Sequence, residues 1–412
     1  MAVTTAEKVT GNTALRPFTV DVPQKDLDDL RARIAATRWP EKETVDDQSQ
    51  GPQLATMQTL ARHWLDKYDW RKCEARLNAY PHFITEIDGL DIHFIHVRSQ
   101  HEDALPLIVT HGWPGSVIEQ LKIIEPLTNP TAHGGSASDA FHLVIPSMPG
   151  YGYSGKPTAK GWGPERIGHA WVQLMRRLGY TRFVAQGGDW GAVVTELMAV
   201  DPAPELLGIH TNMPGVIPPE IDVMFLRNLL GAAPVLDSLP ADLSDEERRT
   251  CEQLDRVWTG GVSYALQMAH RPQVITGLAD SPVFLAAYLL DHDAQSLAMI
   301  SRSFAGEPEG LTPDDVLDNV THFWLTNTGV SAGRLYAENT FSFFGVKGVS
   351  AKVPVAVSVF PQELYQAPKS WAEQAFPNLV HYNKLPKGGH FAAWEQPKYL
   401  CDELRAGFRS VR

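Results

Sequence analysis

Four short, continuously apolar runs constrain the fold of this chain more than any other feature of its sequence. They occur in the segments LPLIVTHG, FHLVIPS, RFVAQGG and LLGIHTNM, and each run ends at Gly, Pro or Asn. Helix-like stretches such as ERIGHAWVQLMRRLG lie between them. Continuous rather than alternating apolar strands, separated by helices, are typical of parallel strands that are covered on both faces. The pattern therefore predicts an α/β protein built on a mainly parallel sheet.

The segments on either side of these runs complete the predicted architecture. Before them, Leu27, Leu30 and Ile34 share one face of a helix, and the Asp88-Gly89 turn indicates a β-hairpin. After them comes a helical, loop-rich stretch, and two more strand candidates, KVPVAVSVF and LVHYNKLP, close the chain. We therefore expect an α/β-hydrolase fold with a helical cap inserted before its last strands. Its predicted parts are a mostly helical leader ahead of any sheet (1–80), the first part of the core (81–215), the cap (216–335) and the second part of the core (336–412).

The charge and the cysteines exclude several classes of protein. The formal net charge is −12 and no cluster of Lys and Arg is longer than a pair, which argues against nucleic acid or an anionic membrane as the main partner. Cys73, Cys251 and Cys401 are far apart and form no CxxC pair, as expected for free thiols in a reducing cytosol. The first twenty residues lack the apolar core of a signal peptide, and no stretch approaches the ~20 apolar residues that span a bilayer. These features predict a cytoplasmic protein without a membrane anchor.

The pentapeptide GGDWG, directly after the RFVAQ strand, has the layout of a nucleophile elbow. Small residues, Gly187 and Gly191, flank a central Asp189 at the position where serine is usual. They would let the backbone bend sharply from strand to helix and expose the central side chain at the carboxyl end of the sheet. An ordinary Asp-containing turn, or an Asp that caps the following helix, GAVVTELMAV, explains the same letters. The pentapeptide alone leaves both interpretations open.

Two later residues supply partners for Asp189 in the chain order typical of this fold, which is nucleophile, acid, histidine. His390 lies in the Gly-Gly loop of KGGHFAAWEQP, after the last strand candidate. Glu363 follows the strand VPVAVSVF within a few residues, in FPQELY. Each could by itself be an ordinary surface or structural residue. Three such residues in order at strand ends predict a catalytic triad of Asp189, Glu363 and His390.

The loop THGWPGS, residues 110–116, follows the LPLIVT strand and is the candidate oxyanion loop. Its glycines and proline can aim backbone N–H groups into a site at the end of the sheet. We expect the two donors to be the amides of Trp113 and Trp190, the latter being the residue after the nucleophile. Their indole rings could equally be part of the core or of the substrate pocket.

Together these motifs resemble the microsomal and juvenile-hormone branch of the epoxide hydrolases. The resemblance rests on HGWPGS, IPSMPGYGYSGKP, GGDWG, FPQE and GGHFAAWEQP, and on the leader RPFTVDVPQKDLDDLRARIAATRWP, which is similar to that branch's N-terminal domain. It extends from about residue 16 to residue 400. Membrane-bound members of the branch carry an N-terminal anchor that this chain lacks, so a soluble, bacterial-type member is implied.

The resemblance implies a two-stage hydrolysis of an epoxide to a vicinal diol. Asp189, already ionised at neutral pH, attacks an epoxide carbon and forms an alkyl ester. His390, made more basic by Glu363, then activates the water that hydrolyses the ester. By their match to the family, Tyr264 in GGVSYALQM and Tyr336 in SAGRLYAENT activate the epoxide oxygen and, with the two tryptophans, bind substrate. No HExxH, CxxC or Gly-rich phosphate motif appears, so neither a metal nor another cofactor is expected.

Two other functions remain open from the sequence. A haloalkane dehalogenase would use the same Asp ester with indole donors for the halide, for which Trp113, Trp190 or Trp324 could serve. A non-catalytic hydrolase-fold protein would use the elbow only for packing. The expected partners are water and a small lipophilic or aryl epoxide, and a homo-oligomer is compatible with the sequence. The physiological epoxide, and a role in detoxification or in natural-product tailoring, are not encoded in any motif.

Overall fold

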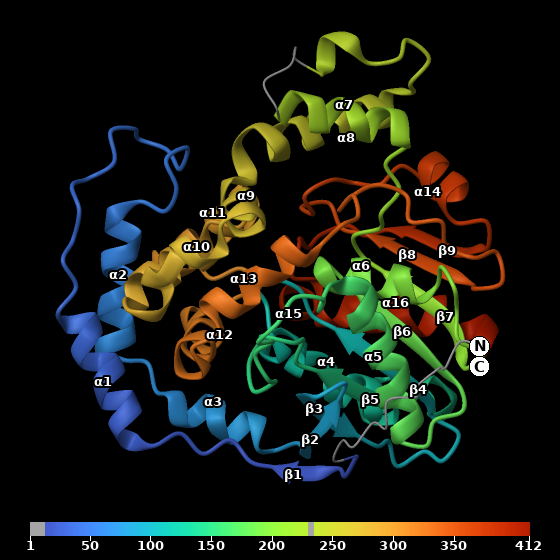
Figure 1. Cartoon of the computed structure of the whole chain (residues 1–412), viewed down its shortest axis with the longest axis horizontal. Coiled ribbons are helices and arrows are strands. Elements are labelled where there is room, and N and C mark those ends of the chain that lie inside the picture. The colour runs from blue at the N-terminus through green and yellow to red at the C-terminus, as the bar shows by residue number, and fades with distance from the viewer. Residues whose placement is uncertain (1–12, 230–234) are drawn as a thin grey trace, which may run out of the picture.

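The computed structural model describes residues 13–229 and 235–412, and the strands in them form one nine-stranded sheet in the order β1-β2-β3-β5-β4-β6-β7-β8-β9 (Figure 1). The pairs β1–β2, β2–β3 and β3–β5 are antiparallel, and the remaining pairs are parallel. The strands are β1 (Arg16–Phe18), β2 (His82–Ile87), β3 (Leu90–Val97), β4 (Leu105–Thr110), β5 (Phe141–Pro146), β6 (Phe183–Gly187), β7 (Leu206–Thr211), β8 (Val355–Val359) and β9 (Leu379–Lys384).

The apolar runs form the buried centre of this sheet. Every residue of β4, β5, β6 and β8 is buried, as continuous apolar strands covered on both faces require. The helices α5 (Pro164–Arg177) and α6 (Trp190–Met198) pack together on one face, and α4 (Leu121–Thr128) and α16 (Pro397–Gly407) pack together on the other (Figure 1). The predicted α/β-hydrolase fold with its mainly parallel sheet is confirmed.

The register of the central strands places three loops together at the carboxyl ends of these strands. Thr110 at the end of β4 pairs with Gly187 at the end of β6, and Gly187 pairs with Thr211 at the end of β7. The segments that follow these residues therefore leave the sheet side by side. In open parallel sheets this carboxyl edge is where ligands bind.

A group of helices between β7 and β8 forms the cap. In Figure 1 they lie beside the sheet, and the chain returns from them to β8. The described residues of this stretch agree with the predicted helical character of residues 216–335, of which 230–234 lie outside the described residues. The helices are α7 (Pro219–Leu229), α8 (Asp245–Arg256), α9 (Ser263–His270), α10 (Pro282–Leu290), α11 (Ala294–Phe304), α12 (Pro313–Thr326) and α13 (Gly329–Glu338), and the shorter α14 (Lys369–Ala375) and α15 (Ala392–Glu395) follow β8 and β9.

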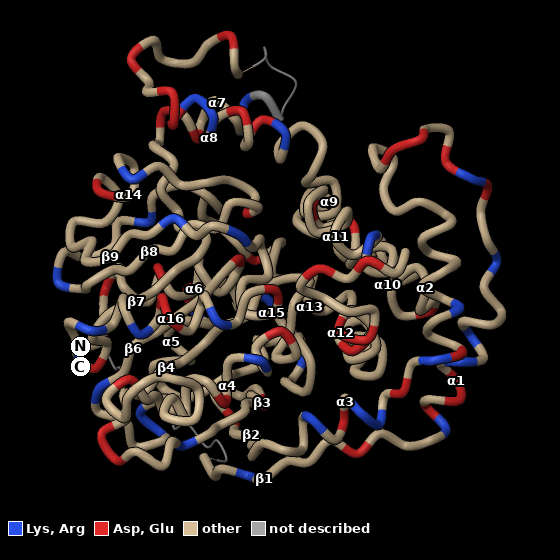
Figure 2. Tube along the Cα trace, turned by 180° about the vertical axis from the view of Figure 1, so that it is seen from behind, with Lys and Arg blue, Asp and Glu red and all other residues tan. Residues whose placement is uncertain are grey.

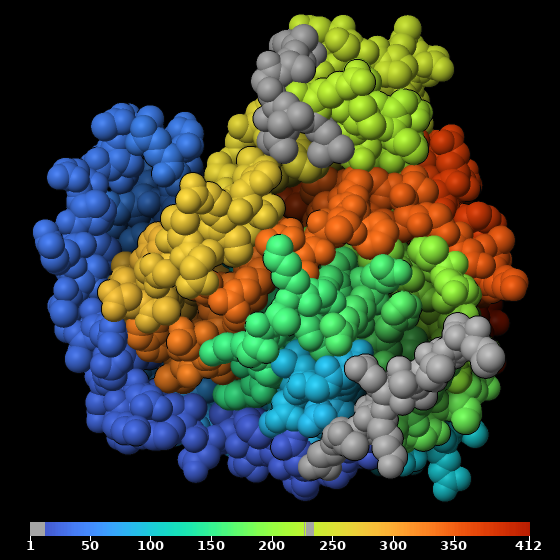
Figure 3. Space-filling model, in the orientation of Figure 1, coloured from blue at the N-terminus to red at the C-terminus, as the bar shows by residue number. Residues whose placement is uncertain are grey.

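The leader wraps around the outer side of the cap (Figures 1 and 3). Its helices are α1 (Gln24–Ala35), α2 (Leu54–Asp66) and α3 (Trp70–Leu77), and α2 contacts α10, α11 and α12. Leu27, Leu30 and Ile34 are buried, as their helical spacing predicted. Lys and Arg alternate with Asp and Glu along the outer side of α1 and α3, so this face is a solvated surface of mixed charge (Figure 2).

The prediction that the leader precedes any sheet is wrong for Arg16–Phe18. This three-residue strand, β1, pairs with β2 at the edge of the sheet, and Val20 and Asn78 exchange two hydrogen bonds of 2.9 and 2.8 Å just beyond it. A strand this short has no periodicity of its own, because its pairing depends on an edge that forms only in the tertiary structure. Residues 1–12 of the predicted leader lie outside the described residues. Among the described residues, no helix is both long and apolar enough to cross a membrane.

Candidate active site

Asp189 lies in a sharp turn between β6 and α6. Its φ of 50° and ψ of −129° are strained values for a residue other than glycine, and its side chain is buried. The flanking glycines make this turn possible. A Cβ on Gly187 would collide with the Gly191 carbonyl oxygen, and a Cβ on Gly191 would collide with that of Thr110. The GGDWG segment therefore has the geometry of a nucleophile elbow rather than that of an ordinary turn.

The two oxygens of the Asp189 carboxylate have different surroundings. Oδ1 accepts a hydrogen bond of 2.7 Å from the backbone N–H of Trp113, in the loop after β4. Oδ2 lies 3.6 Å from Nε2 of His390 and 4.0 Å from Nε2 of His292. Trp190, whose amide the sequence assigns as the second oxyanion donor, is the first residue of α6, directly after Asp189. One oxygen is thus anchored by an amide, and the other faces imidazoles.

His390 and Glu363 meet although they follow different strands. Nδ1 of His390 and Oε1 of Glu363 are 2.6 Å apart, and both side chains are buried. Burial lowers the pKa of His390, but the charges of Glu363, Asp189 and Asp293 outweigh it and raise this pKa to about 10. The predicted acid, histidine and nucleophile therefore form one connected set, with His390 in the middle.

Glu395 holds the loop that carries His390. Its carboxylate accepts hydrogen bonds of 2.9 Å from the backbone N–H groups of Gly389 and Phe391, the two neighbours of His390. Burial raises the pKa of Glu395 to about 7. No role for Glu395 was predicted from the sequence, although this residue lies in the same GGHFAAWEQP motif as His390. The loop before α15 is thereby fixed to the last residue of that helix.

The two predicted tyrosines come from the cap, and each packs against one of the two tryptophans of the site. Tyr264 on α9 stacks on the Trp113 ring at a centroid distance of 4.6 Å, and Tyr336 on α13 meets the Trp190 ring edge-on at 4.8 Å. The Tyr264 and Tyr336 rings are 6.1 Å apart. Burial, together with the Asp189 charge, raises the pKa of both hydroxyls well above 10, so both stay protonated at neutral pH. Two phenol donors thus lie against the two tryptophans that flank the carboxylate.

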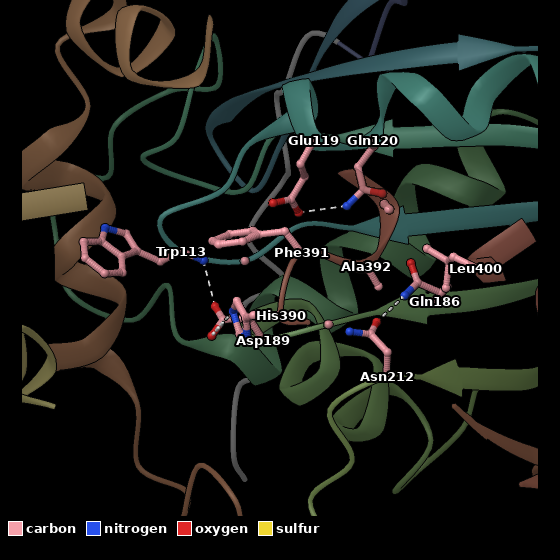
Figure 4. Close-up of a pocket in the computed structure, with 13 residues that line it drawn as sticks. Trp113, Glu119, Gln120, Gln186, Asp189, Asn212, His390, Phe391, Ala392 and Leu400 are labelled. Atoms are coloured by element: carbon pink, nitrogen blue, oxygen red, sulfur yellow. Dashed lines mark hydrogen bonds and ion pairs between the residues drawn. The ribbon is translucent and has the colours of Figure 1, made fainter. Parts of the chain in front are cut away.

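A small polar cavity lies behind Asp189 and His390 (Figure 4). It has room for about one water molecule. Gln186 donates a hydrogen bond of 3.0 Å to Asn212 on one side of it, and Glu119 accepts one of 2.8 Å from Gln120 on another. Within the described part of the chain, Oε1 of Gln186 is buried without a hydrogen-bond partner. Such a polar recess beside a carboxylate suits a bound water.

Several residues of this site were not found from the sequence. His292 and Asp293, between α10 and α11, belong to no recognisable sequence motif. Glu119 and Gln186 are single polar residues within largely apolar stretches of sequence, which gave no indication of a role. The ligand atoms of Asp189, His292 and His390 lie within 4.8 Å of one another, a spacing that a metal ion could use. The expectation that no metal site exists rested on local motifs, and local motifs cannot detect three residues brought together from distant segments.

Comparison with known proteins places the chain in a family. Residues 15–120 match the family model described as "Epoxide hydrolase N terminus", and residues 106–230 match "alpha/beta hydrolase fold". A protein of Stigmatella aurantiaca, whose name assigns it to the epoxide hydrolases, is 49% identical over 97% of this chain and 86% of its own length. The chain belongs to the epoxide hydrolases. The predicted family and enzyme class are confirmed.

Further relatives of this epoxide hydrolase place it in the predicted branch. Epoxide hydrolase 1 of Oryctolagus cuniculus is 33% identical over 95% of this chain and 88% of its own length. The crystal structure of juvenile hormone epoxide hydrolase from the silkworm Bombyx mori superposes with a TM-score of 0.82 at 28% identity, covering 98% of this chain and 97% of that one. The similarity thus includes the leader and the cap as well as the core.

Proposed function

We propose that this epoxide hydrolase works through an ester on Asp189 that water, activated by His390 and Glu363, then hydrolyses. The observation that carries the proposal is the asymmetry of the Asp189 carboxylate. Its Oδ1 is held by the Trp113 N–H at 2.7 Å, while Oδ2 accepts no backbone hydrogen bond from the described residues and lies 3.6 Å from Nε2 of His390. A carboxylate used only for packing would not need one oxygen aimed at a histidine that is itself paired with an acid.

In the first stage, Oδ2 of Asp189 attacks one carbon of the epoxide and the C–O bond of the ring breaks. The negative charge moves to the former ring oxygen, which receives a proton or a hydrogen bond from Tyr264 and Tyr336. Because the pKa of both phenols lies well above 10, both carry the proton that this step needs. General acids of this kind typically contribute about 10²–10⁴-fold to a rate.

In the second stage, water attacks Cγ of the Asp189 ester. Formation of the neutral ester removes the Asp189 charge, which together with Glu363 raises the pKa of His390. This pKa therefore falls in the ester, and the neutral imidazole that acts as the base becomes more populated. The recess beside Gln186 and Asn212 is our proposed position for this water. The charge that develops on Oδ1 is held by the amide of Trp113, with that of Trp190 as the second donor.

We expect the substrate to be a small lipophilic or aryl epoxide, because aromatic rings gather beside Asp189. The rings of Trp113, Tyr264 and Tyr336 meet at centroid distances of 4.6 to 6.1 Å, and Phe343 packs edge-on against Trp190 at 4.8 Å. Flat aromatic rings around two phenols bind an apolar group while the hydroxyls orient its polar ring oxygen.

We also propose that the cap comprises residues 216–335. We further propose that the enzyme works in the cytoplasm, where its three free, buried cysteines stay reduced.

The ester is tested with the variant His390→Gln. Incubated with styrene oxide, this variant should accumulate an adduct of substrate mass on the peptide that contains Asp189, which mass spectrometry of a digest detects. Asp189→Asn is the matched control and should form no adduct. An adduct on another residue, or none on any residue while styrene oxide still binds, would overturn the proposed nucleophile.

The role of the tyrosines separates an epoxide hydrolase from a dehalogenase mechanism. The double variant Tyr264→Phe/Tyr336→Phe should form the ester about 10²–10⁴-fold more slowly, because the ring oxygen leaves without a proton donor. Rapid-quench measurement of ester formation from styrene oxide gives this rate. Turnover equal to that of the wild type would contradict epoxide activation by these tyrosines.

A further inference from the structure

His292 is a second buried imidazole at the nucleophile. It lies in the connection between α10 and α11, its side chain is 1% exposed, and its Nε2 is 4.0 Å from Oδ2 of Asp189. Its ring centroid is 4.3 Å from that of His390. Within the described part of the chain, Nε2 has no hydrogen-bond partner. A buried polar atom without a partner is unfavourable for folding, so the position of this nitrogen beside the carboxylate suggests a role in the reaction.

Asp293 orients this imidazole. Its Oδ2 lies 2.9 Å from Nδ1 of His292, while its Oδ1 accepts the backbone N–H of Ser296 at 2.8 Å, where it caps α11. Burial raises the pKa of Asp293, but its contacts with His292 and the charge of His390 outweigh burial and lower this pKa to about 2. An ionised carboxylate therefore holds Nδ1 and leaves Nε2 directed toward Asp189.

The two dyads at Asp189 have the same construction. In each, a carboxylate binds Nδ1 of a histidine, at 2.6 Å for Glu363 with His390 and at 2.9 Å for Asp293 with His292. In each, Nε2 faces the same Oδ2, and one dyad comes from the core while the other comes from the cap. His82, by contrast, uses both ring nitrogens in hydrogen bonds, one with His93 and one with the Leu77 carbonyl.

We propose that His292 is a second general base for hydrolysis of the Asp189 ester, with Asp293 as its positioning residue. The inference rests on the ester mechanism proposed above. In this step, water forms a bond to Cγ of Asp189 and gives a proton to Nε2 of His292. The bond from Cγ to the alkyl oxygen then breaks, and the diol oxygen takes the proton back from the imidazolium. The second proton of the water, which remains on Asp189 as a carboxylic acid, replaces the proton that the tyrosines gave to the ring oxygen in the first stage, so that Asp189 returns to its carboxylate form.

The test compares the lifetime of the ester in variants with and without each histidine. The enzyme, in excess and with EDTA present, is mixed with styrene oxide, and the ester on the Asp189 peptide is quantified over time by mass spectrometry. In His390→Gln the ester should decay slowly but measurably. In His390→Gln/His292→Gln it should decay at least about tenfold more slowly, since the remaining base is lost. The rate of ester formation should be equal in the two variants within about threefold, because a base acts only on the second stage.

A pH profile separates a base from a packing residue. In His390→Gln, ester decay should increase with pH along one titration, and this titration should be absent from the double variant. The single replacement of His292 leaves the other titratable groups near it in place. Those that face it or lie next to it are Asp189, His390, Tyr264, Asp291 and Asp293, with Glu119 and Glu395 behind His390.

Two further variants keep the test independent of folding defects. Asp293→Asn in the His390→Gln background retains the imidazole but loses its ionised partner, and should lengthen the ester lifetime. Asp291→Asn is the matched control, because its carboxyl group lies against Gly51 instead, and should leave the lifetime unchanged. Equal decay with and without His292 would overturn this inference alone. Failure of any ester to form in His390→Gln would overturn the mechanism on which it rests.

Discussion

Glu119 keeps its carboxyl group in the core, directly behind the nucleophile. Its Oε1 accepts a hydrogen bond of 2.8 Å from Gln120, and a Cβ added to Gly115 would collide with its Oε2. Burial raises the pKa of Glu119 to about 8. The carboxyl group is therefore mainly protonated at neutral pH, and it adds no second negative charge beside Asp189.

Replacement of Glu119 by Gln should make the protein less sensitive to alkaline pH. The raised pKa means that the stabilising contribution of this group is fully present below about pH 4.5 and is lost as the pH rises through 8. Urea unfolding at pH 5 and pH 9 should show a free energy of unfolding that falls by a few kcal/mol more in the wild type than in Glu119→Gln. Equal decreases in the two proteins would show that Glu119 ionises without penalty.

Gly112 leaves space for the nucleophile, and this gives a second prediction for a single residue. A Cβ at this position would collide with the Asp189 carboxylate. Gly112→Ala should therefore lower kcat for styrene oxide by about 10²-fold or more, because displacement of a reacting group by about 1 Å has effects of that size. Gly260→Ala is the control, since a Cβ on Gly260 meets no atom within 4 Å. Full activity of Gly112→Ala would contradict the position of Asp189 described above.

At the scale of elements, helix α12 of the cap fixes the oxyanion loop of the core. Asn319 donates a hydrogen bond of 2.8 Å to the Pro114 carbonyl and accepts one of 2.7 Å from the Ser116 hydroxyl. Pro114 and Ser116 lie on either side of Gly115 in the loop, and Pro114 directly follows Trp113. The loop that presents the Trp113 N–H to Asp189 is thus tied to a helix that is distant in sequence.

Asn319→Ala should loosen this loop and reduce the rate more than substrate binding. We expect kcat to fall about tenfold or more with a smaller change in KM, since the Trp113 amide stabilises charge that develops during the reaction. The Pro114 carbonyl and the Ser116 hydroxyl lose a buried partner, so the free energy of unfolding should fall by about 1–3 kcal/mol. Steady-state kinetics and urea unfolding measure both. Asp314 is half-exposed on the same helix and pairs with His63 of α2. Asp314→Asn should therefore leave kcat and KM unchanged, and an equal fall in kcat in both variants would show that the Asn319 contacts are not specific.

At the scale of the whole molecule, the leader and the cap form one packed unit. Trp64 of α2 is buried and donates a hydrogen bond of 3.0 Å to Thr321 of α12, and Tyr68 donates one of 2.8 Å to Asp318 of the same helix. Asp318 also pairs with Arg76 of α3. Because α12 in turn holds the oxyanion loop, the leader supports the site through the cap.

Trp64→Ala should therefore destabilise the entire enzyme rather than release the leader alone. Removal of a fully buried aromatic side chain costs about 3–5 kcal/mol. Calorimetry should show a single transition at a lower temperature, with activity lost in parallel. Trp39→Ala, at an exposed position of the leader, is the control and should have little effect. A separate low-temperature transition that leaves activity intact would show that the leader folds independently of the cap.

Much of the fold was predictable because it depends on short-range patterns. Continuous apolar runs identify buried parallel strands, and the glycines around Asp189 identify the elbow, since only residues without a Cβ permit that backbone approach. Chain order and position after strands also led to Glu363 and His390, which lie 2.6 Å apart in the structure. Their catalytic roles remain predictions, and the variants described above test them.

The sequence by itself determined the class of fold, the elbow with its candidate triad, and the family, because each depends on local residue types at fixed spacing. Only the tertiary structure decided that Arg16–Phe18 joins the sheet, that Asn319 holds the oxyanion loop, and that His292 with Asp293 faces the nucleophile. These features depend on contacts between segments far apart in the chain. A single side chain such as His292 has no periodicity or motif from which its contact with Asp189 could be predicted. Its position depends only on how the cap packs over the sheet.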